Sequence, residues 1–397
     1  MLGAPHFGTS SQYTGRHAQE TGITGTFGYG IIGCGWVASA HAWGVRSLEG
    51  EGVRLVALAD SDAGRARALA GQFGEAQVFS DYRQLLARDD IHAVSICLPD
   101  FLHTEATLEA AACGKHVLCE KPLAVDLAGA DEMVSACIRG GVRLGIVMNH
   151  RYARDNIATK AAIRGRALGT LVAAGVLHSS ALTGDPDATS PWRGRRGLAA
   201  GGVLATQAIH FLDLLLWFAG PVASVQAYTA RLHRFEFDYE DTAALAMQLR
   251  SGALATLVTT NLAPIMDDLQ GTRLDLHGTA GHVSLHGDRV GAWHCECAYE
   301  DIAVTLPGVP REVTRAAFGA GHVHQVVDFV RAIRRGADAP VPGLDGRHLI
   351  AVLMAADDSA RTGRRVQVAG LDDAYSRISD DESLLSSSVS SAPFGPA

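Results

Sequence analysis

Two short segments of this sequence carry side chains that can move protons. The first is the segment 119–122, Cys-Glu-Lys-Pro, in which a charged pair directly follows an apolar run and a proline then fixes the chain. An ammonium group held beside a cationic ligand has a depressed pKa, which suits acid/base work near neutrality. We therefore expect Lys121 to be catalytic. The alternative is a surface Glu-Lys pair that precedes a helix.

The second segment lies in the other half of the chain, where Thr206, His210 and Asp213 follow one another at helical spacing. Residues i, i+4 and i+7 share one face, so a helix predicted over 206–218 would present all three side chains together. His210 can share a proton with a hydroxyl or carbonyl group, and Asp213 can orient its imidazole. The alternative is a buried histidine satisfied by Asp213, and both descriptions can hold at once.

A glycine-rich turn predicts the ligand that these segments would serve. Gly33, Gly35 and Ala38 match the pattern G-x-G-x-x-G/A, between an apolar run at 27–32 and a helix-like stretch at 36–48. Gly33 allows a sharp turn, Gly35 leaves room for a pyrophosphate, and the helix N-terminus presents free N–H groups. The pattern therefore predicts a dinucleotide site.

Asp60 indicates which dinucleotide is bound. It ends the next apolar run, 22 residues beyond Ala38, where an acidic residue is expected to meet a ribose. A carboxylate pairs with the two ribose hydroxyls and repels a 2′-phosphate, so NAD(H) is favoured over NADP(H). Arg65 and Arg67 lie nearby and could bind a 2′-phosphate, so NADP(H) remains an alternative cofactor. The alternative role for Asp60 is to cap the helix that follows.

Strand-like and helix-like segments alternate through the first half of the chain, which predicts a doubly wound parallel sheet with right-handed connections. The expected strands are 27–32, 53–60, 78–79, 93–98, 117–119 and 144–148. After Arg151 a meander of strands predicts a second α/β domain with a large, open, mostly antiparallel sheet. Its expected strands are 171–179, 222–232, 242–249, 253–261, 272–277 and 281–285, and helices at 323–334 and 346–361 follow.

This pattern divides the chain into four segments. We expect a disordered leader at 1–26, a dinucleotide-binding domain at 27–149, a substrate-binding and oligomerisation domain at 150–368, and a disordered, serine-rich tail at 369–397. The final helices are free to pack back on the first domain. An exposed open sheet favours a homodimer or homotetramer.

Composition limits the classes of function. The 397 residues are 47% hydrophobic, enough for two cores, and the formal net charge of −8 comes without a basic cluster suited to nucleic acid. No apolar run approaches the roughly 20 residues of a membrane span, and residues 1–26 lack the apolar core of a signal peptide. Seven scattered cysteines fit a reducing cytoplasm. Cys295 and Cys297 are expected on a strand, the alternative being a metal site, and we predict no metal.

Taken together, these motifs resemble one known family. The glycine fingerprint, the segment 97–103, Glu120-Lys121-Pro122, Arg151 and the element His210-x-x-Asp213 are similar to the glucose–fructose oxidoreductase, inositol dehydrogenase and rhizopine-catabolism (Gfo/Idh/MocA) family. The resemblance covers roughly residues 27–368. It implies a Rossmann domain, an α/β domain whose open sheet serves substrate and oligomer contacts, and NAD(P)-dependent oxidoreduction of sugars, cyclitols or sugar nucleotides.

The resemblance also assigns roles to single residues. It implies that Lys121 and His210 are the acid/base pair. The residues expected to contact the cofactor are Gly33, Gly35, Trp36, Val37, Asp60, Ser61, Leu98, Pro99, His103, Glu120, Lys121 and Arg151.

One departure from the family pattern bears on the substrate. Many members carry aspartate four residues before the histidine, where this chain has Thr206 followed by Gln207. Thr206 holds no charge, which argues against a copy of the inositol dehydrogenase site. Trp192 offers a stacking face and Arg193 can bind a phosphate or carboxylate, and this segment is similar to members that act on sugar nucleotides or glycosides. The alternative is that the segment is an exposed basic loop. The expected substrate-binding residues are Lys121, Trp192, Arg193, Thr206, Gln207 and His210.

We therefore expect an NAD-dependent dehydrogenase or ketoreductase. A hydride would move between nicotinamide C4 and a secondary alcohol or ketone carbon of a sugar-like substrate, while Lys121 and His210 manage the proton on its oxygen. The alternative function within this class is an NADPH-dependent sugar 3-ketoreductase. An alternative of a different class is a non-catalytic regulator that senses the dinucleotide, and the presence of both Lys121 and His210 counts against it.

Overall fold

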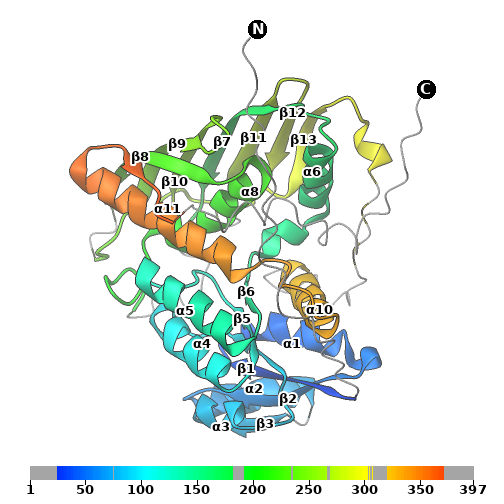
Figure 1. The fold of residues 1–397 in the computed structure, drawn as a ribbon. Helices are drawn as coiled ribbons and strands as arrows, with labels where there is room; N and C mark the ends of the chain where they lie inside the picture. The colour runs from blue at the N-terminus through cyan, green and yellow to red at the C-terminus, as the bar shows by residue number, and fades with distance from the viewer. Residues whose placement is uncertain are drawn as a thin grey trace.

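The computed structural model describes residues 25–370 apart from 75, 182–191, 234–235, 266–268, 303, 305 and 307–319, and it contains two sheets (Figure 1). The predicted leader and tail fall almost wholly on residues 1–24 and 371–397, which lie outside the described residues.

The first sheet has six strands, all parallel, in the order β3-β2-β1-β4-β5-β6. The strands are β1 (Phe27–Ile32), β2 (Val53–Ala59), β3 (Gln77–Phe79), β4 (Ala93–Ile96), β5 (His116–Cys119) and β6 (Leu144–Ile146). Its helices are α1 (Ala38–Arg46), α2 (Ala63–Phe73), α3 (Tyr82–Leu86), α4 (His103–Ala112) and α5 (Leu127–Gly140). The predicted doubly wound sheet is confirmed, and its strand order reverses between β1 and β4, where such sheets bind ligands.

The second sheet has eight strands in the order β13-β12-β11-β7-β10-β9-β8-β14. They are β7 (Leu171–Ser179), β8 (Val222–Ala230), β9 (Thr242–Leu249), β10 (Leu254–Thr260), β11 (Thr272–Gly278), β12 (His282–His286), β13 (Arg289–His294) and β14 (Val366–Gln367). All pairs are antiparallel except β7 with β10. The mostly antiparallel sheet is confirmed, but a simple meander is wrong, because β7 lies between β10 and β11.

Helices cover one face of this second sheet. They are α6 (Arg154–Arg164), α8 (Ile209–Ala219) and α11 (Gly343–Thr362), which contact β13, β7 and β8 respectively (Figure 1). The other face follows the two-residue period of a strand, so that Leu254 and Val258 of β10 and Leu177 of β7 are exposed there. Among the described residues, the sheet is therefore open on one side, as predicted.

A helix from late in the chain completes the first half. The helix α10 (Gly321–Arg334) packs on α1, so closely that a Cβ on Gly44 would lie 2.5 Å from Cβ of Val326. Arg331 of α10 also forms an ion pair with Glu51. The final segment of the chain thus joins the parallel sheet to the antiparallel one.

The region after β12 differs from the sequence prediction. The strand β13 was not expected, and Cys295 and Cys297 lie in a bend after it instead of on a strand. The indole Nε1 of Trp293 donates to the carbonyl of Cys297 at 2.8 Å, which holds the bend. Within the described ranges, no group of three His, Cys, Asp or Glu side chains is arranged to hold a metal ion.

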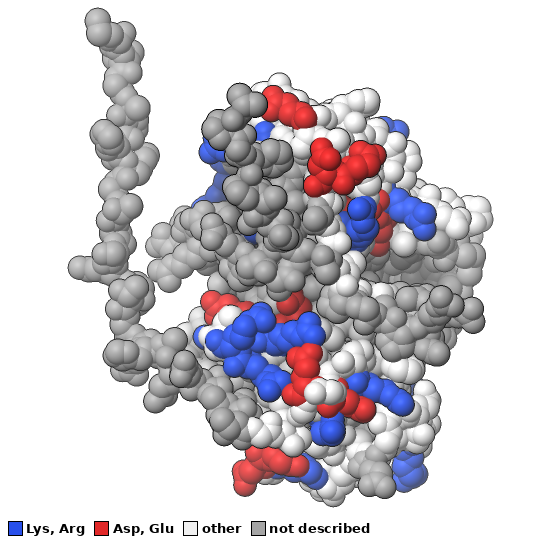
Figure 2. Space-filling view, turned by 90° about the vertical axis from the view of Figure 1, so that its right-hand side faces the viewer, with Lys and Arg blue, Asp and Glu red and all other residues white. Residues whose placement is uncertain are grey.

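Surface charge is mixed on the face drawn in Figure 2. Over the described part of that face, Lys and Arg side chains lie beside Asp and Glu instead of forming one continuous basic area. None of the helices in the described segments combines the length and apolar character needed to cross a bilayer.

Candidate active site

The turn after β1 is shaped for a ligand that approaches the backbone. Gly33 has a φ of +89°, and a Cβ there would lie 2.4 Å from the carbonyl oxygen of Cys97. A Cβ on Gly35, by contrast, would have no atom within 4 Å, so this glycine faces open space. The first turn of α1 has no side-chain cap at Val37, and Trp36 beside it is 41% exposed. These features fit a pyrophosphate at the helix N-terminus.

Asp60 lies at the end of β2 and is tied to this turn. Its carboxylate accepts a hydrogen bond from the backbone N–H of Cys34 at 2.7 Å and another from that of Asp62 at 2.8 Å. The helix α2 is capped by Asp62, so the alternative role of Asp60 as a helix cap is wrong. Ser61 is exposed beside it. Asp60 therefore stands where the dinucleotide prediction needs a carboxylate.

The loop after β4 approaches the same edge of the sheet. Leu98 and Pro99 are partly exposed there, as cofactor contacts would be. His103 is not exposed, because its ring is fully buried. Its Nε2 lies 2.8 Å from the Leu98 carbonyl oxygen and its Nδ1 lies 2.8 Å from that of Pro122. His103 can therefore act on a bound cofactor only through these loops.

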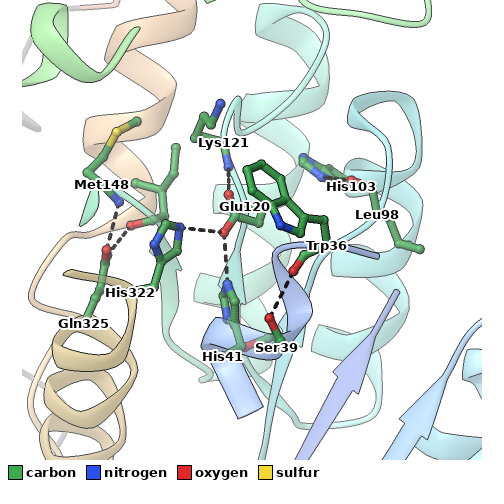
Figure 3. Close-up of polar contacts among 12 residues, drawn as sticks. Trp36, Ser39, His41, Leu98, His103, Glu120, Lys121, Met148, His322 and Gln325 are labelled. Carbon is green, nitrogen blue, oxygen red and sulfur yellow. Dashed lines mark hydrogen bonds and ion pairs between the residues drawn. The ribbon is translucent and has the colours of Figure 1, made fainter. Parts of the chain in front are cut away.

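Glu120 follows β5 and anchors a buried polar network (Figure 3). Its Oε1 lies 2.9 Å from Nε2 of His41 and 3.6 Å from Nε2 of His322. Burial alone would raise the pKa of Glu120, but the hydrogen bonds with His322 and His41 hold it well below its usual range. The other nitrogen of His41 lies 2.7 Å from Ser95 Oγ. Glu120 thus provides a fixed negative charge directly before Lys121.

Lys121 reaches from the parallel sheet to the other half of the chain. Its Nζ donates to the carbonyl oxygen of Thr206 at 2.8 Å, and its backbone N–H donates to Glu120 Oε2 at 3.2 Å. In Figure 3 the Lys121 side chain points away from the Glu120 carboxylate. The structure therefore brings the predicted catalytic lysine to the segment that leads into His210.

The helix predicted over 206–218 is confirmed from Ile209 onward, but its predicted start is wrong, because a break separates Thr206 from the rest. The short α7 (Val203–Thr206) ends where Gln207 leaves helical geometry, with φ −121° and ψ −53°, and α8 begins at Ile209. The backbone N–H of His210 therefore contacts the Gln207 carbonyl, at 3.4 Å, instead of that of Thr206. Thr206 Oγ1 donates to the Gly202 carbonyl at 2.8 Å, and Gln207 Oε1 is buried.

His210 faces Lys121 from α8. Burial, and then the positive charge of Lys121 and the neighbouring His150, hold the pKa of His210 well below its ordinary value. Its Nδ1 has no hydrogen-bond partner among the described residues. A neutral imidazole with an available nitrogen can accept or return a proton.

The partner expected for His210 is engaged elsewhere. Asp213 accepts two hydrogen bonds from the Arg151 guanidinium, at 2.6 and 2.8 Å, so the expectation that it orients His210 is wrong. Arg151 also pairs with Asp345 at 2.7 Å, and its side chain is 5% exposed. Arg151 therefore joins three parts of the chain. Its contact with the cofactor remains a prediction, and the burial of its side chain argues against it.

Two residues at the site escaped the sequence analysis. The His150 ring centre lies 4.9 Å from that of His210, and its Nδ1 lies 2.9 Å from Asp288. Asn156 Nδ2 donates to Asp288 at 2.9 Å and so fixes this pair. His150 could have been found from its place after β6, at the strand ends that also carry Lys121, whereas Asp288 lies in the turn before the unpredicted β13.

The Trp192 loop lies across from the first half of the chain. The Trp192 and Phe101 rings are 6.4 Å apart, and the Arg193 guanidinium carbon lies 4.7 Å from the centre of the Trp192 ring. Arg195 pairs with Asp238 at 3.7 Å. Part of the segment that leads into this loop, residues 182–191, lies outside the described residues.

Comparison with protein families agrees with this site. Residues 27–148 match the model of an oxidoreductase family with an NAD-binding Rossmann fold, and residues 157–284 match the GFO/IDH/MocA C-terminal domain. The chain belongs to the GFO/IDH/MocA family. It is thus an oxidoreductase with an NAD-binding Rossmann fold, which confirms the predicted family, fold and enzyme class.

Relatives of known activity cover nearly the whole chain. D-apiose dehydrogenase of Paraburkholderia graminis is 27% identical, over 86% of this chain and 90% of its own length. Inositol 2-dehydrogenase of Rhizobium meliloti is 28% identical, over 87% of this chain and all of its own. The crystal structure of WlbA dehydrogenase from Bordetella pertussis with NADH and UDP-GlcNAcA superposes with a TM-score of 0.73 at 27% identity, covering 86% of this chain and 98% of that one.

Proposed function

We propose that the chain interconverts a secondary alcohol and a ketone on a sugar or cyclitol, with Lys121 and His210 handling the proton on the reacting oxygen. The observation that carries the proposal is the meeting of these two residues from opposite halves of the chain. Lys121 is hydrogen-bonded to Thr206, four residues before His210, and its charge contributes to the low pKa of His210.

Each residue has a part that its surroundings support. NAD, when bound, takes up or returns the hydride at its nicotinamide ring. The neutral imidazole of His210 accepts the proton of the substrate hydroxyl in the oxidising direction and returns it in the reducing direction. Lys121 donates a hydrogen bond to the same oxygen. Gly35, Trp36 and Asp60 would hold the dinucleotide, since the turn is open and the carboxylate is fixed beside it.

The relatives support a polyhydroxylated substrate. The names of D-apiose dehydrogenase, inositol 2-dehydrogenase and the WlbA complex with UDP-GlcNAcA refer to a sugar, a cyclitol and a sugar nucleotide, respectively. In this chain Thr206 and Gln207 would bind substrate hydroxyls, and Trp192 with Arg193 would contact its far end. Arg193 gives this end the positive charge that a phosphate or carboxylate requires.

A turnover assay on a panel of sugars, cyclitols and sugar nucleotides tests the proposal. Formation of NADH is followed by its absorbance, with the Lys121→Met variant as the control for adventitious activity. We expect turnover by the unchanged protein on at least one compound and its loss in the variant. NADH binding without turnover on any of them would favour the dinucleotide-sensing regulator, and a clear preference for NADPH would favour the 3-ketoreductase.

We further propose a cytoplasmic homodimer or homotetramer that associates through the open sheet. The support is the apolar row on its uncovered face, where Leu177, Leu254 and Val258 are 54, 62 and 43% exposed on neighbouring strands. A Leu254→Asp substitution should dissociate the assembly, which light scattering would measure. A monomeric unchanged protein would contradict the proposal.

A further inference from the structure

The surroundings of His103 are unusual for a histidine. Both ring nitrogens lie 2.8 Å from backbone carbonyl oxygens, Nε2 from that of Leu98 and Nδ1 from that of Pro122. Carbonyl oxygens only accept hydrogen bonds, and a neutral imidazole has one N–H and one lone pair. In either neutral tautomer a lone pair would therefore face a carbonyl lone pair at 2.8 Å. Only the doubly protonated ring satisfies both contacts.

The titratable groups beside the ring agree with a positive charge. Burial by itself would lower the pKa of His103, but Cys119, Asp100 and the Leu98 carbonyl together raise it to about 10. Asp100 is 6% exposed and accepts a hydrogen bond from the backbone N–H of Ala200 at 3.3 Å. A carboxylate enclosed beside an imidazolium stabilises it more strongly than one in water.

Two neighbouring residues at the start of β5 show that this arrangement is specific. The buried ammonium group of Lys115 also donates to two carbonyl oxygens, those of Arg88 at 2.7 Å and Ile91 at 2.9 Å. His116 has the opposite environment, because its Nδ1 accepts a hydrogen bond from the backbone N–H of Arg143 at 3.0 Å. Burial lowers the pKa of His116 to about 4. His103 and His116 should therefore differ in charge throughout the neutral range.

We propose that His103 is a positioning residue that stays protonated throughout the neutral range and joins the loop after β4 to the loop after β5. Pro122 directly follows Lys121, and Leu98 follows Cys97, whose carbonyl lies against Gly33. The imidazolium thus holds the backbone that carries Lys121 against the strand end that packs on the glycine turn. Its effect on the reaction rests on the proposed function of Lys121, whereas its charge state does not.

The charge state is tested on the full-length protein labelled with ¹⁵N-histidine. Long-range ¹H–¹⁵N spectra separate imidazolium from neutral rings, and the His103→Asn variant identifies the signal by its loss. We expect both His103 nitrogens to be protonated at pH 8.5, and His116, identified through His116→Asn, to be neutral at pH 5.5. A His103 ring with one deprotonated nitrogen at pH 8.5 would overturn the proposal.

The positioning role is tested with the same matched variants. The amide nitrogen that His103→Asn introduces can serve only one of the two carbonyls, so we expect kcat to fall about 10- to 100-fold, more than the affinity for NADH. In His116→Asn the new amide oxygen can accept from Arg143, and kcat should stay within about twofold. Unchanged kcat in a folded His103→Asn would contradict the role. If that variant does not fold, His103→Gln takes its place in both tests.

A failure of the proposed function gives a different result. If Lys121 were not catalytic, Lys121→Met would turn over normally while the His103 imidazolium signal persisted. If instead the unchanged protein gave no imidazolium signal for His103 while Lys121→Met was inactive, the proposed role of His103 would be refuted. The acid/base assignment of Lys121 would then still hold.

Discussion

The Nζ of Lys121 is bound to the carbonyl oxygen of Thr206 at 2.8 Å, although 85 residues separate them in the chain. In an unbroken helix that oxygen would accept from the backbone N–H of His210. Because the helix is interrupted at Gln207, the oxygen is available to the lysine, and His210 starts a new helix beside it. The break therefore places both proposed acid/base residues at one point.

Removing the lysine should stop the chemistry without weakening cofactor binding. Lys121→Met keeps most of the volume and removes the charge and the donor, so we expect kcat to fall about 10²- to 10⁴-fold. The dissociation constant of NADH, measured by fluorescence titration, should change little. His210→Gln should lower kcat to a similar extent, and the two losses should be less than additive if the residues act as one unit.

A distant substitution of the same kind serves as the control. Arg361→Met alters a side chain of an exposed ion pair at the end of α11 and should leave kcat within about twofold. Near-normal turnover in Lys121→Met would reject the assignment and revive the dinucleotide-sensing regulator.

Cofactor preference should depend on Asp60. Asp60→Asn removes the negative charge but keeps an oxygen that can accept from Cys34. A charge-assisted hydrogen bond contributes roughly 1.5–3 kcal/mol, so the ratio of NADPH to NADH affinity should shift toward NADPH by about tenfold or more. Asp358→Asn, which makes the same change in an exposed ion pair at the end of α11, should not change this ratio. Tighter binding of NADPH than NADH by the unchanged protein would contradict the prediction.

The parallel sheet was predictable because its signals are local. The run at 27–32 is apolar throughout, as a strand buried on both faces requires, and every residue of β1 is buried. Gly33 and Lys121 follow strands whose carboxyl ends must meet in a doubly wound sheet. Short-range patterns therefore sufficed to bring the glycine turn and the lysine together.

The rest of the site depends on contacts between distant residues. Nothing local to Gln207 predicts that the helix stops there, and helical spacing alone paired Asp213 with His210. Asp213 instead binds Arg151, 62 residues away, because a guanidinium supplies two charge-assisted hydrogen bonds where an imidazole supplies one. His150 is likewise held by Asp288, 138 residues later in the chain. A single sequence carries no sign of such pairs.

The buried ion pair of Arg151 should be costly to break. Asp213→Asn leaves the guanidinium with one charged partner, Asp345, in a site from which water is excluded. Removing one member of a buried pair typically costs about 3–5 kcal/mol, so the free energy of unfolding in urea should fall by that order. Asp358→Asn makes the same change in an exposed pair and should cost less than about 1 kcal/mol. Equal losses in the two variants would show that burial is not the cause.

Acid should destabilise the fold through its buried neutral histidines. In the folded state burial lowers the pKa of His116 to about 4, whereas the unfolded chain has a value near 6.5. Below pH 6.5 the unfolded state therefore binds more protons, and stability falls until the pH passes about 4. His348, with a pKa lowered to about 3, acts in the same direction. His103 contributes to stability in the opposite direction, because its pKa is raised to about 10 in the folded state. Its stabilising contribution is therefore present at low pH and is lost as the pH rises through that value.

His116→Asn isolates one of these contributions, because the amide oxygen can take over the hydrogen bond from Arg143. Between pH 7.5 and pH 5.0 the unchanged protein should lose about 2 kcal/mol more unfolding free energy than the variant, which follows from the two pKa values. Urea unfolding curves at both pH values give this difference directly. Parallel losses in the two proteins would mean that folding does not change the pKa of His116, contrary to its burial and its hydrogen bond with the Arg143 N–H.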